Sequence, residues 1–159
     1  MIGHITYLSD ASMSAKFGRR LQDADQRGFR LDVEYQVESY LRHQGQAFVE
    51  RFDGNAYLYI TRAMDYYDAS DHGRGDLVRA VAKAQCAWMA VSFTSDWLYP
   101  PSGSREFVRA LVQNRQPVSY FNIDSPYGHD AFLLETERLS GLVAHFLETV
   151  QAKGPGHGA

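Results

Sequence analysis

The chain of 159 residues lacks several features that would point to particular classes of protein. Its one cysteine, Cys86, excludes an intramolecular disulfide and a four-thiolate metal site, and it suits a reducing compartment. The net charge is -3, so there is no basic field for nucleic acid or an anionic membrane. No long apolar run and no signal-like leader occur. We therefore expect a soluble, cytoplasmic protein that binds neither nucleic acid nor membranes.

Several short catalytic and ligand-binding motifs are missing as well. The histidines have no HExxH or CxxC context, so the sequence predicts neither a metal site nor a bound cofactor. No Gly-x-Ser-x-Gly occurs, which is the turn that presents a nucleophilic serine in α/β-hydrolases. Cys86 precedes an apolar run and is interpreted as a buried packing residue. What remains is an ordinary globular composition, with 45% hydrophobic and 22% charged residues.

The first part of the chain has helical periodicity. Residues 1–8 suit a linker or the start of a helix, and Met13, Phe17 and Leu21 then recur every four residues. A second apolar face runs from Val37 to Phe52, and a third from Tyr57 to Tyr67 after a break at 53–55. The sequence thus predicts a helical segment over residues 1–72, with the polar, glycine-containing stretch 69–75 as the boundary.

The second part alternates between strand and helix patterns. A short helix is predicted from residue 76 to about 84, and the apolar run 87–93 is typical of a strand buried on both faces. A helix over 104–114 and a strand over 117–123 complete a βαβ unit, and a one-faced helix follows from Leu139 to Val150. We expect an α/β domain over 73–153 and a disordered tail over 154–159. Two strands are too few for a stable sheet, so strands from elsewhere should complete it.

Two polar side chains follow these strands. Asp96 comes after the first strand, and His129 lies on the turn after the second, Ser125-Pro126-Tyr127-Gly128-His129. The carboxyl ends of neighbouring parallel strands meet at one edge of a sheet, where α/β proteins place their sites. A carboxylate that orients an imidazole makes a general base. The alternative is that Asp96 caps a turn and that His129 only occupies a loop. Asp130 follows His129, and a common use of an aspartate at such a place is to cap the next helix.

Several runs together resemble the homoserine O-acyltransferases of the α/β-hydrolase type. They are residues 2–10, 17–19, 37–42, 51–53, 95–101 and 124–134. The resemblance implies the C-terminal part of an α/β-hydrolase fold, preceded by a helical lid that also forms a homodimer. It implies a ping-pong reaction between acyl-CoA and L-homoserine, with Asp96 as the triad acid, His129 as the base and Asp130 as the contact for the substrate amino group. The nucleophilic serine of the family is missing, so we expect this chain alone to be inactive.

The acyl donor depends on one position in this resemblance. Family members that use succinyl-CoA tend to have an arginine two residues after the triad acid, and Leu98 occupies that place. An apolar side chain offers nothing to a second carboxylate, so acetyl-CoA is favoured over succinyl-CoA. Serine remains open as the acceptor. An esterase or thioesterase, and a non-catalytic lid and dimer module, are the other hypotheses.

Overall fold

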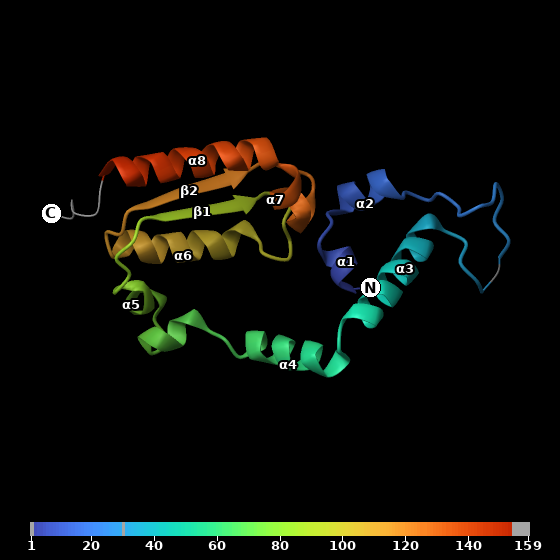
Figure 1. Cartoon of the computed structure of the whole chain (residues 1–159), viewed down its shortest axis with the longest axis horizontal. Coiled ribbons are helices and arrows are strands. Elements are labelled where there is room, and N and C mark those ends of the chain that lie inside the picture. The colour runs from blue at the N-terminus through green and yellow to red at the C-terminus, as the bar shows by residue number, and fades with distance from the viewer. Residues whose placement is uncertain (1, 30, 154–159) are drawn as a thin grey trace. The chain divides into compact units, whose positions relative to one another are not determined.

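A computed structural model of the chain describes residues 2–29 and 31–153 (Figure 1). The backbone separates into two compact units between Asp68 and Ala69. The tail predicted for 154–159 lies outside the described residues. Within the part that is described, no helix combines the length and the apolar character needed to cross a membrane.

The first unit is helical, as the sequence predicts. Its helices are α1 (Ile2–Thr6), α2 (Asp10–Lys16), α3 (Gln36–Arg51) and α4 (Gly54–Asp65). Ser9 caps α2 by accepting a hydrogen bond from the Ser12 N–H, and Asp53 caps α4 through the N–H groups of Asn55 and Ala56. Helix α3 continues through Gly45 without interruption.

One helix is shorter than its periodicity predicts. Helix α2 ends at Lys16, and Leu21 lies outside it in an isolated bridge with Tyr35. The cause is Gly18, whose φ of +53° is left-handed and stops the helix one turn early. Phe17 is nevertheless buried, because its ring packs on the Tyr40 ring at 4.9 Å between centroids.

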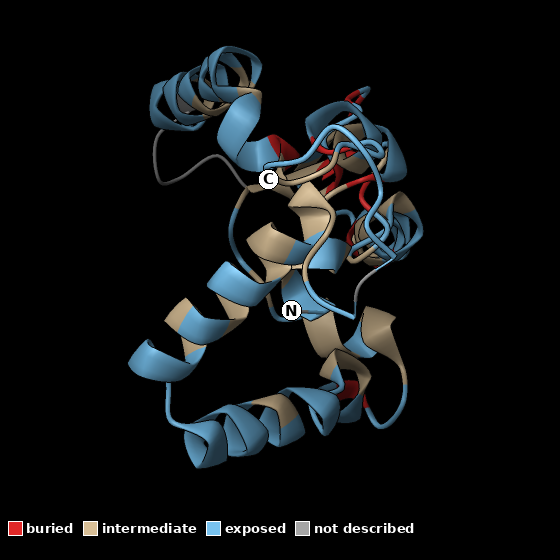
Figure 2. Ribbon diagram, turned by 90° about the vertical axis from the view of Figure 1, so that its right-hand side faces the viewer, coloured by how far each residue is buried: buried red, intermediate tan, exposed pale blue. Residues whose placement is uncertain are grey.

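Aromatic contacts link the two longest helices of this unit. Phe48 and Phe52 of the α3 end stack at 5.0 Å, and Phe48 meets the Tyr57 ring of α4 edge-on at 5.7 Å. Beyond this corner α4 has little cover, since every residue of it except Thr61 is exposed (Figure 2). The apolar face predicted for this helix is therefore unburied within the unit.

The second unit holds the α/β part. Its elements are η1 (Ala69–Gly73), α5 (Leu77–Val81), β1 (Trp88–Phe93), α6 (Pro101–Gln113), β2 (Val118–Ile123), η2 (Gly128–Asp130), α7 (Ala131–Leu134) and α8 (Thr136–Lys153). The strands are parallel, in register from Trp88↔Val118 to Phe93↔Ile123. Figure 1 shows α6 along one face of this sheet and α8 along the other. The predicted strand, helix, strand order is thus confirmed.

The core of this unit lies at the carboxyl ends of the strands. Phe93, Ile123 and Ala131 are buried together, with Val91 and Leu142 packed against them. In α6, Leu111 is fully buried. These contacts fix the strand ends from which the two site-bearing loops leave.

Two expectations about burial were wrong. Strand β1 is buried only at Ser92 and Phe93, and its first four residues are half-buried. The physical reason is that the sheet has two strands among the described residues. The outer edge of β1 and part of each of its faces therefore lack neighbours. Cys86 is exposed rather than packed, because it lies in the connection before β1.

Candidate active site

The two loops that carry the predicted acid and base start side by side. Phe93 pairs with Ile123 at the ends of the strands, and the Thr94 N–H donates to the Ile123 carbonyl at 3.0 Å. Each chain then leaves the same edge of the sheet. The structure therefore brings Asp96 and His129 together, although 33 positions separate them.

Asp96 and His129 form a direct side-chain pair. The distance between Asp96 Oδ2 and His129 Nδ1 is 2.9 Å, and the side chains are 7% and 22% exposed. A carboxylate at Nδ1 favours the tautomer that carries its proton on that nitrogen, so that Nε2 is the atom that can accept another. This is the arrangement of an oriented general base.

The other carboxylate oxygen of Asp96 holds its own loop. Oδ1 accepts hydrogen bonds from the backbone N–H groups of Leu98 at 3.1 Å and Tyr99 at 2.8 Å. Both oxygens of this buried side chain are thus satisfied, which is what a charge in such a place requires. Asp96 therefore caps a turn, as the alternative interpretation expected, but His129 contacts it and does not merely occupy a loop.

Aromatic side chains border the imidazole. The Tyr99 ring lies 5.0 Å from the His129 ring between centroids, and the Phe132 ring lies 5.5 Å away. Both aromatic side chains remain partly open to solvent, at 57% and 43%. The two rings therefore lie beside the imidazole and limit the space around it.

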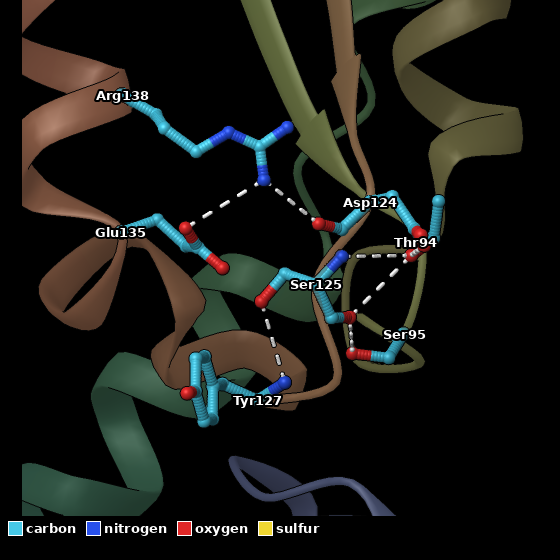
Figure 3. A network of polar contacts seen from close by, with 7 residues as sticks. All are labelled: Thr94, Ser95, Asp124, Ser125, Tyr127, Glu135 and Arg138. Atoms are coloured by element: carbon cyan, nitrogen blue, oxygen red, sulfur yellow. Dashed lines mark hydrogen bonds and ion pairs between the residues drawn. The ribbon is translucent and has the colours of Figure 1, made fainter.

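A set of hydroxyl groups ties the acid loop to the base loop (Figure 3). Thr94 Oγ1 donates to Asp124 Oδ1 at 2.8 Å and accepts from the Ser125 N–H at 3.1 Å. Ser95 Oγ donates to the Ser125 carbonyl at 2.5 Å and accepts from the Gly128 N–H at 2.9 Å. The sequence reasoning missed this role for Thr94 and Ser95. The available signal was a hydroxyl residue at each position directly after the strand.

The base loop is also held from α8. Arg138 donates to the Asp124 carbonyl at 3.0 Å and lies 3.7 Å from the Glu135 carboxylate, as Figure 3 shows. Inside the loop, the Ser125 hydroxyl accepts from the Tyr127 N–H at 3.4 Å. Ser125 is 3% exposed and therefore acts as a structural residue of the turn.

The structure places the remaining predicted site residues near this pair. Asp130 follows His129 at the end of η2 and is half-buried, but its side chain makes no capping hydrogen bond to α7. The capping interpretation of Asp130 was therefore wrong, because its αR backbone belongs to the preceding turn rather than to an extended cap position. Leu98 is half-buried, and it contacts Asp96 through the hydrogen bond that its backbone N–H donates to Oδ1.

The described residues contain no group of three histidine, cysteine or acidic side chains that could hold a metal ion. The pair itself needs none for proton transfer. A carboxylate–imidazole pair of this geometry is able to take a proton from a hydroxyl or thiol, with the carboxylate stabilising the imidazolium that results.

Comparison with known proteins adds relatives that cover nearly all of the chain. A homoserine O-succinyltransferase of Cupriavidus metallidurans is 56% identical over 94% of the chain, and one of Ralstonia nicotianae is 55% identical over 94%. A homoserine O-acetyltransferase of Solidesulfovibrio magneticus is 54% identical over 93%. The chain spans only 37–38% of the length of these curated relatives. No protein-family model matches it.

Solved structures show the same fold. A homoserine O-acetyltransferase from Bacillus anthracis matches 92% of the chain with a TM-score of 0.78, at 17% identity and over 39% of its own length. Esterase E22 matches 90% of the chain with a TM-score of 0.72, at 16% identity, again over 39% of its length. The fold is therefore part of an α/β-hydrolase fold, and the sequence is similar to that of homoserine O-acyltransferases over 37–38% of their length.

Proposed function

We propose that the chain forms part of a homoserine O-acyltransferase, in which Asp96 and His129 are the acid and base of a Ser-Asp-His triad. The observation that carries the proposal is the 2.9 Å pair between Asp96 Oδ2 and His129 Nδ1 at the carboxyl edge of a parallel sheet. The names of the relatives supply the reaction class.

The reaction has two proton transfers through His129. A serine in the part of the enzyme that this chain does not span attacks the thioester of acyl-CoA. His129 takes the serine proton and returns it to the departing CoA thiolate. The homoserine hydroxyl then gives its proton to His129 and attacks the acyl-serine ester, and the proton returns to the serine. Asp96 stabilises the imidazolium in both halves.

Asp130 is proposed to bind the ammonium group of homoserine. It follows the base directly, is half-buried, and does not use its carboxylate to cap α7. A charge-assisted hydrogen bond to this carboxylate would hold the substrate with its hydroxyl near His129.

Different observations support two acyl donors, succinyl-CoA and acetyl-CoA. The names of the relatives from Cupriavidus and Ralstonia support succinyl-CoA, whereas the name of the Solidesulfovibrio relative supports acetyl-CoA. Leu98 in the acid loop supports acetyl-CoA, because an apolar side chain cannot pair with a second carboxylate. The preference expected from Leu98 stays a prediction, as does the cytoplasmic location.

A second copy of the chain is the proposed partner of the helical segment, which we infer to be the lid. The exposed residues of α4 include Leu58, Tyr59 and Met64, at 64%, 80% and 60%. Exposed apolar side chains gathered on one helix favour burial in an interface. The assignment of residues 1–72 to this lid and of 73–153 to the hydrolase domain is likewise proposed.

The experiment joins this chain to the part of the Cupriavidus metallidurans relative that it does not span. We expect this completed protein to release CoA from succinyl-CoA or acetyl-CoA only when homoserine is present, and the product mass identifies the donor. Serine in place of homoserine tests the other acceptor. The chain of residues 1–159 alone should release no CoA above background, because it lacks the serine turn.

The competing functions give different results in the same assay. Equal CoA release with and without homoserine would identify a thioesterase, an activity class that the likeness to esterase E22 makes worth measuring. A stable dimer in sedimentation, without activity in the completed protein, would instead identify a lid and dimer module.

A further inference from the structure

The hydroxyl of Ser95 lies between the two loops of the site. It donates to the Ser125 carbonyl at 2.5 Å and accepts from the Gly128 N–H at 2.9 Å (Figure 3). Ser95 directly precedes Asp96, and Gly128 directly precedes His129. One side chain therefore links the backbone positions adjacent to the acid and to the base.

The backbone conformation of Gly128 sets the direction of the N–H group that donates to Ser95. Gly128 has a φ of +71° and is buried, so its N–H direction is set by a left-handed turn that glycine adopts without strain. A buried N–H needs an acceptor, and Ser95 Oγ provides it. A movement of the Ser95 hydroxyl would thus be transmitted to the turn on which the imidazole is mounted.

We propose that Ser95 is a positioning residue for the acid–base pair. Its two hydrogen bonds set the separation of the loops, and this separation sets the contact between Asp96 Oδ2 and His129 Nδ1. Ser95 would touch neither substrate nor the reacting atoms. The expected change in the rate of acyl transfer rests on the proposed function. The expected change in the contact between Asp96 and His129 does not.

Substitution of Ser95 tests this role, and Ser92 supplies a matched control. Ser92 is a buried serine near the end of β1, whereas Ser95 is half-buried, and the Ser92 hydroxyl contacts Asn122 Oδ1 at 2.8 Å and the Tyr120 hydroxyl at 2.7 Å rather than the site loops. Ser92→Ala therefore removes two side-chain hydrogen bonds that do not involve the loops of Asp96 and His129. Ser95→Thr keeps the hydroxyl, and Ser95→Cys keeps the side-chain size while weakening both hydrogen bonds.

The first measurement is NMR of His129 in the full chain. A carboxylate next to Nδ1 holds the proton on that nitrogen. We expect Ser95→Ala to broaden or remove the Nδ1–H signal of His129. Ser95→Thr should restore this signal, and Ser92→Ala should leave it unchanged. Ser95→Cys should weaken the signal as Ser95→Ala does, which keeps the test decisive if the alanine variant does not fold.

The second measurement is kinetics of the completed protein. Ser95→Ala should lower kcat by about ten- to a hundredfold, since small displacements of catalytic groups cost rates of this order, while KM is unchanged. An unchanged Nδ1–H signal of His129 in Ser95→Ala or Ser95→Cys would overturn the proposal, whether or not acyl transfer occurs. Absence of acyl transfer with an altered NMR signal would refute the proposed function and leave the role of Ser95 supported.

Discussion

Asp96 uses one carboxylate oxygen for His129 and the other for its own loop. Oδ2 lies 2.9 Å from His129 Nδ1, and Oδ1 accepts the backbone N–H groups of Leu98 and Tyr99. The loop thus fixes the orientation of the carboxylate, and the carboxylate fixes the imidazole. This division allows the charge of Asp96 to be removed by mutation while much of the loop geometry is retained.

Asp96→Asn should separate orientation from charge. The amide oxygen can still accept from Leu98 and Tyr99, but the amide NH₂ would face Nδ1 and favour the wrong tautomer of His129. We expect kcat of the completed protein to fall by roughly 10⁴, as expected of a triad whose base has the wrong tautomer. Thermal unfolding of Asp96→Asn checks that the fold is retained, and a rate within tenfold of the parent would contradict the assigned role.

Gly128→Ala should destabilise the chain, because an alanine at a φ of +71° costs about 1–2 kcal/mol. Gly141→Ala is the matched control, since a Cβ there would meet nothing within 4 Å inside helix α8 and should stabilise by up to about 1 kcal/mol. Denaturant unfolding followed at the second unit distinguishes the two. A Gly128→Ala variant as stable as its parent would contradict the left-handed turn.

The start of α3 should weaken in acid. The Glu38 carboxylate accepts the N–H groups of Tyr35 and Glu34, and these hydrogen bonds, helped by Arg42, lower its pKa from the ordinary 4.5. Because the folded pKa is the lower one, this stabilisation is complete above about pH 4.5 and is lost as the pH falls through the folded value.

Amide exchange measures this effect at residues 34–39. Protection there should decrease below pH 4.5 in the parent. In Glu38→Gln the protection should be low both above and below pH 4.5. Glu50→Gln, which changes the opposite end of the same helix, is the control. Protection that is independent of both pH and Glu38 would exclude the capping role.

Local pattern predicted much of this fold. The helix expected over 104–114 corresponds to α6, and the apolar runs before Thr94 and Asp124 indicated the strands. The Asp96–His129 pair followed from topology, because parallel strands end at one edge. These features depend on neighbours in sequence or on a general property of α/β sheets, so a single sequence is sufficient.

The remaining features depend on tertiary contacts. The end of α2 depends on the left-handed Gly18 rather than on the apolar period that reaches Leu21. The exposure of Cys86 follows from its place in the connection before β1. The hydroxyl of Ser95 becomes informative only after Gly128 is placed 2.9 Å away, since 33 positions separate them in the chain.

The most direct measurement of the central claim is formation of O-acyl-homoserine by the completed protein with His129 replaced by Gln. Mass spectrometry with homoserine and either acyl-CoA follows the product, and circular dichroism verifies the fold of His129→Gln. We predict that the parent forms the acyl ester and that His129→Gln forms it only at background. Ester formation by His129→Gln at a rate close to that of the parent would contradict the assignment of His129 as the base.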